Sequence, residues 1–138
     1  MKKPSSVTTN DWKLLKVKYK NLKRVVKKIE NYFPVQYLIG YVDFYGYKIN
    51  VNRNVLIPRF ETETLVEKTI KLIKKYKLKN SSLIDLGTGS GCISIVLKKE
   101  IETLDITALD ISKKALKVAI KNAKYNKADI TFIHEDIY

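Results

Sequence analysis

Apolar residues near the N-terminus recur every three or four positions, with lysines between them. This spacing holds over residues 15–33 and is typical of one face of an α-helix. It predicts a helix over residues 11–31 that is capped by Asn10 or Asp11 and ends before Pro34, because a proline disfavours helical geometry in the residue before it. A single helix cannot bury such a stripe alone. The stripe is therefore expected to pack on the following domain or on helices outside this chain.

The pattern changes beyond residue 40. Aromatic and β-branched side chains alternate with polar ones over residues 41–52, with Gly46 at the bend, which predicts a β-hairpin. Helical spacing returns over residues 62–77. Acidic side chains lie near the start of this segment and lysines near its end, as the helix dipole favours, so the charges support the helical prediction.

Three short apolar segments alternate with two helical ones in the rest of the chain. The strands are predicted over residues 82–86, 106–110 and 130–134, and the helices over residues 90–99 and 112–125. Helical crossovers join parallel strands through right-handed connections. The predicted fold class is therefore α/β, with the first three strands of a Rossmann-like parallel sheet, preceded by a β-hairpin and an N-terminal helix.

A glycine-rich turn joins the first of these strands to the helix after it. The turn consists of Gly87, Thr88, Gly89, Ser90 and Gly91, and glycines allow a backbone to approach a ligand closely. Asp110 ends the next strand, nineteen residues after Gly91, where a carboxylate can accept hydrogen bonds from ribose hydroxyls. The functional interpretation is a site for an adenosine-containing ligand. The alternative is a tight turn beside a structural aspartate.

The spacing of the turn narrows the class of ligand. Its pattern is G-x-G-x-G, not the G-x-G-x-x-G of NAD-binding turns, and it contains no lysine or arginine to meet a pyrophosphate. Cys92 follows Gly91, whereas a Walker loop has a lysine and then a serine or threonine at this point. These differences disfavour NAD and exclude a Walker loop.

Composition indicates one globular protein with a modest core. The chain has 138 residues, of which 45% are hydrophobic, and Cys92 is its one cysteine, so neither an internal disulfide nor a cysteine-based zinc site can form. No apolar run approaches the roughly 18 residues that span a bilayer. His134 is the one histidine and has no partner at metal-ligand spacing. The sequence therefore predicts a cytoplasmic protein without a membrane segment or a metal site.

The positive charge is concentrated in two segments. The formal net charge is +13, and residues 1–30 carry ten basic against two acidic side chains, while residues 68–84 carry six basic and no acidic ones. Most of the basic residues are lysines, whereas specific phosphate recognition favours arginine. A solvated lysine-rich surface is one interpretation. A weak attraction to nucleic acid or the ribosome is the other.

The turn and Asp110 resemble the first motif and the ribose-binding acid of class I S-adenosylmethionine-dependent methyltransferases. Further segments resemble, in the same order, the release factor glutamine methyltransferases of the HemK type. These segments are residues 34–40, 55–63, 85–91 and 110–123. Phe60 stands where that family usually has proline. The resemblance divides the chain into a helical segment, 1–33, and a hairpin followed by the N-terminal half of a methyltransferase domain, 34–138.

This resemblance implies a cofactor, a substrate and a set of contacts. The cofactor would be S-adenosylmethionine, and the substrate would be the side-chain amide of the glutamine in the GGQ loop of peptide chain release factors. The cofactor contacts would be Gly87 to Gly91 and Asp110, with Asp136 and Ile137 beside the adenine. The Asn-Pro-Pro-Tyr segment that holds the glutamine in this family does not occur in these residues, so no catalytic residue is assigned and the chain alone is expected not to complete the transfer.

Two other functions remain open from the sequence. The net charge of +13 suits an amino-methyltransferase that acts on RNA or DNA. A non-enzymatic remnant that still binds the cofactor is the second alternative.

Overall fold

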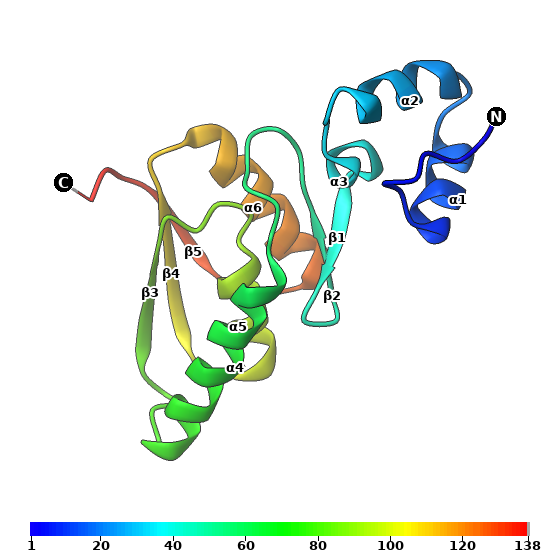
Figure 1. The fold of residues 1–138 in the computed structure, drawn as a ribbon. Helices are drawn as coiled ribbons and strands as arrows, with labels where there is room; N and C mark the ends of the chain where they lie inside the picture. Colours follow the sequence, from blue (N-terminus) through cyan, green and yellow to red (C-terminus); the bar gives the residue numbers. More distant parts are fainter. Residues whose placement is uncertain (138) are drawn as a thin grey trace. The chain divides into compact units, whose positions relative to one another are not determined.

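The computed structural model describes residues 1–137 and divides into two compact units, Met1–Tyr41 and the residues from Val42 onward. The helices of the first unit are α1 (Thr9–Lys18), α2 (Leu22–Glu30) and α3 (Val35–Ile39). The remaining elements are β1 (Tyr41–Phe44), β2 (Tyr47–Asn50), α4 (Phe60–Lys75), β3 (Ser82–Leu86), α5 (Cys92–Glu100), β4 (Asp105–Asp110), α6 (Lys113–Asn126) and β5 (Thr131–His134) (Figure 1).

The prediction of one helix over residues 11–31 is wrong, because the chain breaks between α1 and α2. Tyr19 is extended, and the side chain of Asn21 accepts a hydrogen bond from the backbone N–H of Arg24 at 3.2 Å, which starts a new helix. Asparagine favours such caps over helix interiors. The start of α1 also differs from the prediction, since Thr8 and not Asn10 or Asp11 provides the cap.

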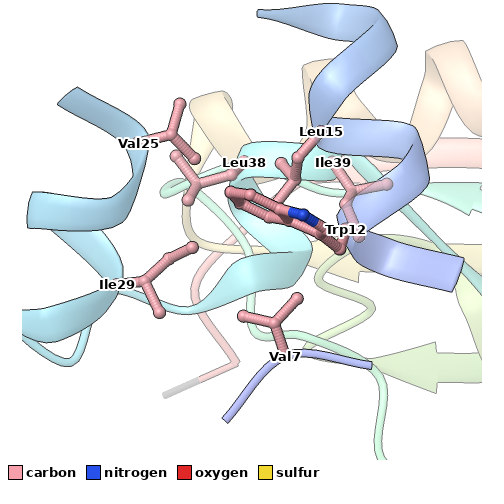
Figure 2. Packing of buried hydrophobic residues seen from close by; sticks show 7 residues of the cluster. All are labelled: Val7, Trp12, Leu15, Val25, Ile29, Leu38 and Ile39. Carbon is pink, nitrogen blue, oxygen red and sulfur yellow. The ribbon is translucent and has the colours of Figure 1, made fainter. Parts of the chain in front are cut away.

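The apolar stripe of α1 and α2 is buried inside the N-terminal unit itself. The break lets the two helices face each other and α3, a helix that the sequence analysis did not predict. Figure 2 shows the side chains that meet in this core, which are Val7, Trp12, Leu15, Val25, Ile29, Leu38 and Ile39. The hydroxyl of Tyr19 donates to the Leu38 carbonyl at 2.9 Å, so the residue at the break also holds α3.

The parallel sheet confirms the predicted fold class. Its strand order is β3-β4-β5 and both pairs are parallel, with Leu83 opposite Ile106 and Ala108 opposite Phe132. The predicted boundaries of the three strands agree with the structure within one residue. The predicted hairpin is also present as β1 and β2, and α4 begins two residues before the predicted start of its helix.

The two faces of the parallel sheet have different surroundings. Helices α4, α5 and α6 lie on one side of it (Figure 1), and on this helix-covered face Ile106 and Ala108 are 1% and 0% exposed. On the opposite face, here named the open face, Ile84 and Leu86 are 64% and 57% exposed. Strand alternation places these two sets of side chains on opposite faces, and none of the described helices covers the second set.

The hairpin turn is fixed from two sides. Tyr45 and Gly46 both have positive φ angles, 53° and 79°, as a two-residue turn between twisted strands requires. The backbone N–H of Tyr45 donates to Oε1 of Glu63 in α4 at 2.7 Å, and that of Gly46 donates to Oδ1 of Asp43 at 3.2 Å. The acidic first turn of α4 therefore binds the hairpin as well as complementing the helix dipole.

Candidate cofactor site

The glycine-rich turn between β3 and α5 is fastened to the neighbouring strand through its backbone. The N–H groups of Gly87 and Thr88 both donate to the carbonyl of Leu109, each at 2.9 Å, and the N–H of Gly91 donates to the Thr88 carbonyl at 2.9 Å. Main-chain hydrogen bonds to β4 and within the turn therefore hold the path of the turn.

The three glycines of the turn share a backbone conformation that favours glycine, and the first and last of them have different surroundings. All have positive φ angles, between 58° and 80°, which other residues adopt at a cost. A Cβ atom on Gly87 would meet nothing within 4 Å, whereas one on Gly91 would lie 3.2 Å from the Cβ of Ala119 in α6. Gly91 therefore allows α6 to pack closely, while Gly87 leaves open space that a ligand can approach.

Asp110 lies against this turn, as the sequence analysis expected. Its Oδ2 accepts a hydrogen bond from the Gly89 N–H at 2.8 Å, and its Oδ1 accepts one from the Ser112 N–H at 2.8 Å. Ser112 is the N-cap of α6, so the carboxylate also lies at the positive end of a helix dipole. The turn, the end of β4 and the start of α6 thus meet at one side chain.

Asp85, near the end of β3, binds hydroxyl groups of the turn and of α5. Its Oδ2 accepts hydrogen bonds from the Thr88 hydroxyl at 2.8 Å and from the Ser94 hydroxyl at 2.5 Å. Thr88 is 7% exposed and Ser90 is 3% exposed. These two predicted site residues therefore direct their side chains into the protein, and the turn presents mainly backbone to a ligand.

Asp136 and Ile137 follow β5, the strand next to β4 in the sheet. Both side chains are exposed. His134, the last residue of β5, is paired in parallel register with Asp110, and its Nε2 lies 2.8 Å from the Ile111 carbonyl just after β4. Residues 135–137 therefore continue from the same end of the sheet as Asp110.

Cys92 has the environment of a packed thiol, not of a nucleophile. Burial raises its pKa to about 11, and the negative charge of Asp85 acts in the same direction. Across residues 1–137, no group of three or more histidine, cysteine or acidic side chains is arranged to hold a metal ion. Within the same residues, no helix has the length and apolar character that crossing a membrane requires.

The structural role of Asn122 is not predicted from the sequence. This side chain is 0% exposed and donates to the carbonyl of Ser90 in the turn at 2.9 Å. It also bonds to the backbone of Asn50 at the end of the hairpin. An asparagine on the apolar face of a helix, three residues after Ala119, was the available signal, because a buried amide must find partners.

Comparison with known proteins identifies the family of the chain. The model of the methyltransferase small domain family matches residues 60–138. The chain belongs to this family. A release factor glutamine methyltransferase of Flavobacterium psychrophilum is 43% identical over 138 residues, covering 99% of this chain and 48% of the relative. One of Lactococcus lactis subsp. lactis is 42% identical over 118 residues, covering 86% of this chain and 43% of the relative.

These relatives confirm the resemblance to release factor glutamine methyltransferases. The chain spans about half the length of the curated relatives that it matches. Among solved structures, the tRNA (uracil-54, C5)-methyltransferase of Pyrococcus abyssi, in complex with S-adenosyl-L-homocysteine, has a TM-score of 0.54 at 18% identity and covers 68% of this chain and 23% of its own. The Pyrococcus horikoshii protein PH0793 has a TM-score of 0.56 at 14% identity, with coverages of 70% and 36%. At these identities the likeness shows the fold alone.

Proposed function

We propose that the chain binds S-adenosylmethionine at the Gly87–Gly91 turn and is part of a cytoplasmic enzyme that methylates the GGQ glutamine of peptide chain release factors. The observation that carries the proposal is the 2.8 Å hydrogen bond from the Gly89 N–H to Asp110, which holds the predicted ribose-binding acid against the turn. The names of the relatives support the substrate.

The residues present fit this cofactor. Each oxygen of a carboxylate can accept about two hydrogen bonds, so Asp110 keeps acceptor capacity for ribose hydroxyls after its bonds to Gly89 and Ser112. The space above Gly87 is open. Residues 80–97 contain Asp85 but no lysine or arginine, which suits a ligand without phosphates. Asp136 and Ile137 would lie beside the adenine.

In the proposed reaction these residues hold the cofactor in position. Bound S-adenosylmethionine supplies an activated methyl group on a sulfonium. An amide nitrogen is a poor nucleophile, so the reaction depends on holding the two reactants in a productive geometry. The backbone of the turn and the carboxylate of Asp110 fix one of these reactants relative to the sheet.

Calorimetric titration with S-adenosylmethionine tests the cofactor site. Replacing Asp110 by alanine removes charge-assisted hydrogen bonds, each worth roughly 1.5–3 kcal/mol, and is expected to weaken binding by about 10-fold or more. Asp105→Ala is the matched control, because Asp105 lies at the opposite end of the same strand and is exposed. Thermal unfolding of both variants checks that the fold is retained. Equal affinity of Asp110→Ala and wild type would refute the site.

Crosslinking tests the substrate. A purified release factor with a photoreactive residue in place of the GGQ glutamine is mixed with the chain and S-adenosylmethionine. Crosslinks at this position, and not from the same probe on a distant surface of the release factor, support the proposal. A salt-resistant complex with RNA, without crosslinks to the release factor, would instead favour a nucleic-acid methyltransferase.

A further inference from the structure

Asn122 is a buried amide whose hydrogen bonds reach two separate parts of the site. It lies on α6 and is fully buried. Its Oδ1 accepts from the backbone N–H of Asn50 at 2.8 Å and from Nδ2 of Asn50 at 2.9 Å. Its Nδ2 donates to the carbonyls of Asn50 and Ser90, both at 2.9 Å.

This arrangement fixes the orientation of the Asn122 amide. A primary amide has two N–H donors and two acceptor lone pairs, and the four bonds use all of them. Rotating the amide by 180° would place its oxygen against two carbonyl oxygens and its nitrogen against two donors. The partners therefore determine one orientation, and a fully satisfied buried network of this kind holds its members rigidly.

The two partners belong to segments with different tasks. Ser90 lies in the turn proposed to hold the cofactor. Ala119, one helical turn before Asn122, packs closely against Gly91 of the same turn. Asn50 is the last residue of β2, and residues 51–59 follow it. Leu56 within this segment is 71% exposed, and Phe60, the first residue of α4, is 79% exposed. Asn122 thus joins the cofactor turn to the end of β2, from which the chain continues into residues 51–59.

Asn126 provides an internal comparison on the same helix. Its Nδ2 donates to the Lys48 carbonyl of β2 at 3.0 Å and to the Asn122 carbonyl at 3.0 Å. Asn126 therefore also ties α6 to the hairpin, but no hydrogen bond of its side chain reaches the turn. Asn122 is more deeply buried than Asn126, and of the two side chains it is the one that bonds to Ser90 in the turn.

We propose that Asn122 is a positioning residue that couples the cofactor turn to the hairpin, so that occupancy of the turn stabilises the end of β2. This inference rests on the proposed function of the turn. By linkage, if the end of the hairpin favours cofactor binding, then the bound cofactor must favour the ordered hairpin end by the same factor. If Asn122 does not couple the two segments, cofactor binding has no such effect on the hairpin end.

Hydrogen exchange on the wild-type chain tests the coupling without any substitution. The exchange rates of individual backbone amides are measured by NMR with and without saturating S-adenosylmethionine. The Asn50 N–H, bound to Asn122, is expected to slow by fivefold or more. The Tyr45 N–H, which lies in the same hairpin but is bound to Glu63, is expected to change by less than twofold.

Two variants then separate Asn122 from the general docking of α6. Asn122→Ala is expected to weaken S-adenosylmethionine binding by about 10-fold and to abolish the cofactor-dependent protection of Asn50. Asn126→Ala is expected to bind within twofold of wild type and to keep that protection. Asn50→Ala removes one bond to Asn122 without touching the turn, and a two- to threefold weaker affinity is expected, so the proposal can still be judged if Asn122→Ala does not fold.

The outcomes distinguish this inference from the proposed function. Binding of S-adenosylmethionine that leaves the Asn50 amide unchanged, or that slows the amides of Asn50 and Tyr45 equally, would overturn the coupling and leave the cofactor site intact. Wild-type affinity in Asn122→Ala would do the same. No binding by the wild-type chain would overturn the proposed function and, with it, the role of Asn122.

Discussion

The two faces of the parallel sheet consist of similar residues in different surroundings. Ile106 on the helix-covered face is 1% exposed, and Ile84 on the open face, one strand away, is 64% exposed. Parallel sheets are usually covered on both faces, and their strands are apolar throughout. The open face has the composition of a covered one. Apolar character in these strands therefore does not by itself show which residues stabilise this chain.

The largest expected effect lies on the helix-covered face. Ile106→Ala should lower the free energy of unfolding by about 2–5 kcal/mol, because it leaves a cavity among well-packed side chains. Urea unfolding followed by circular dichroism measures the change. A loss below about 1 kcal/mol would show that the helices do not pack on this face as tightly as the structure indicates.

Gly91→Ala tests the close packing of α6 against the cofactor turn. The alanine would have to keep a positive φ of 80°, and its methyl group would lie 3.2 Å from the Cβ of Ala119. The free energy of unfolding is therefore expected to fall by about 1–3 kcal/mol. Gly46→Ala is the control, because Gly46 has a similar φ of 79° but nothing within 4 Å of the added atom. Equal losses in the two variants would remove the steric part of the explanation.

The burial of Cys92, the first residue of α5, should make the stability of the protein depend on pH. Its pKa in the folded protein is about 11, raised from 9.0 mainly by burial. The folded state therefore keeps the thiol proton in a range where the unfolded chain loses it, so this contribution is present below pH 9 and declines as the pH rises toward 11. Relative to Cys92→Ala, the wild type should lose on the order of 1 kcal/mol by pH 10, as measured by denaturant unfolding at each pH. Parallel curves for the two proteins would contradict this.

The smallest effect is expected on the open face. Ile84→Ala removes the same atoms as Ile106→Ala, but from a side chain that is 64% exposed, so a change within about 0.5 kcal/mol is expected. The same urea experiment applies. A loss comparable to that of Ile106→Ala would mean that Ile84 is covered in solution, and the contrast between the faces would not hold.

The sheet and its turn follow from local signals in the sequence. The strands are short apolar segments bounded by polar residues, and Ser112 caps α6 through a 3.2 Å bond from the Ala115 N–H, as its position before a helical segment predicts. The glycine turn and Asp110 lie together because parallel strands end at the same edge of a sheet. These features depend on a few residues near one another in the chain.

The break after α1 and the role of Asn122 depend on distant residues. Periodicity continues across Tyr19 and Asn21, so the pattern does not reveal that Tyr19 bonds to Leu38 and that Asn21 starts a second helix. Asn122 and Asn50 are 72 positions apart in the sequence. Helical spacing marks Asn122 as buried but does not identify its partners, since tertiary contacts decide them.

The two amide contacts of Asp110 have a thermodynamic consequence for any ligand of the turn. An aspartate side chain in an unfolded chain samples several rotamers, and ordering a side chain has an entropic cost. The bonds from Gly89 and Ser112, both 2.8 Å, already restrict the carboxylate in the folded protein. Folding has therefore met this cost before a ligand arrives, and Asp110 acts on that ligand as a preorganised group.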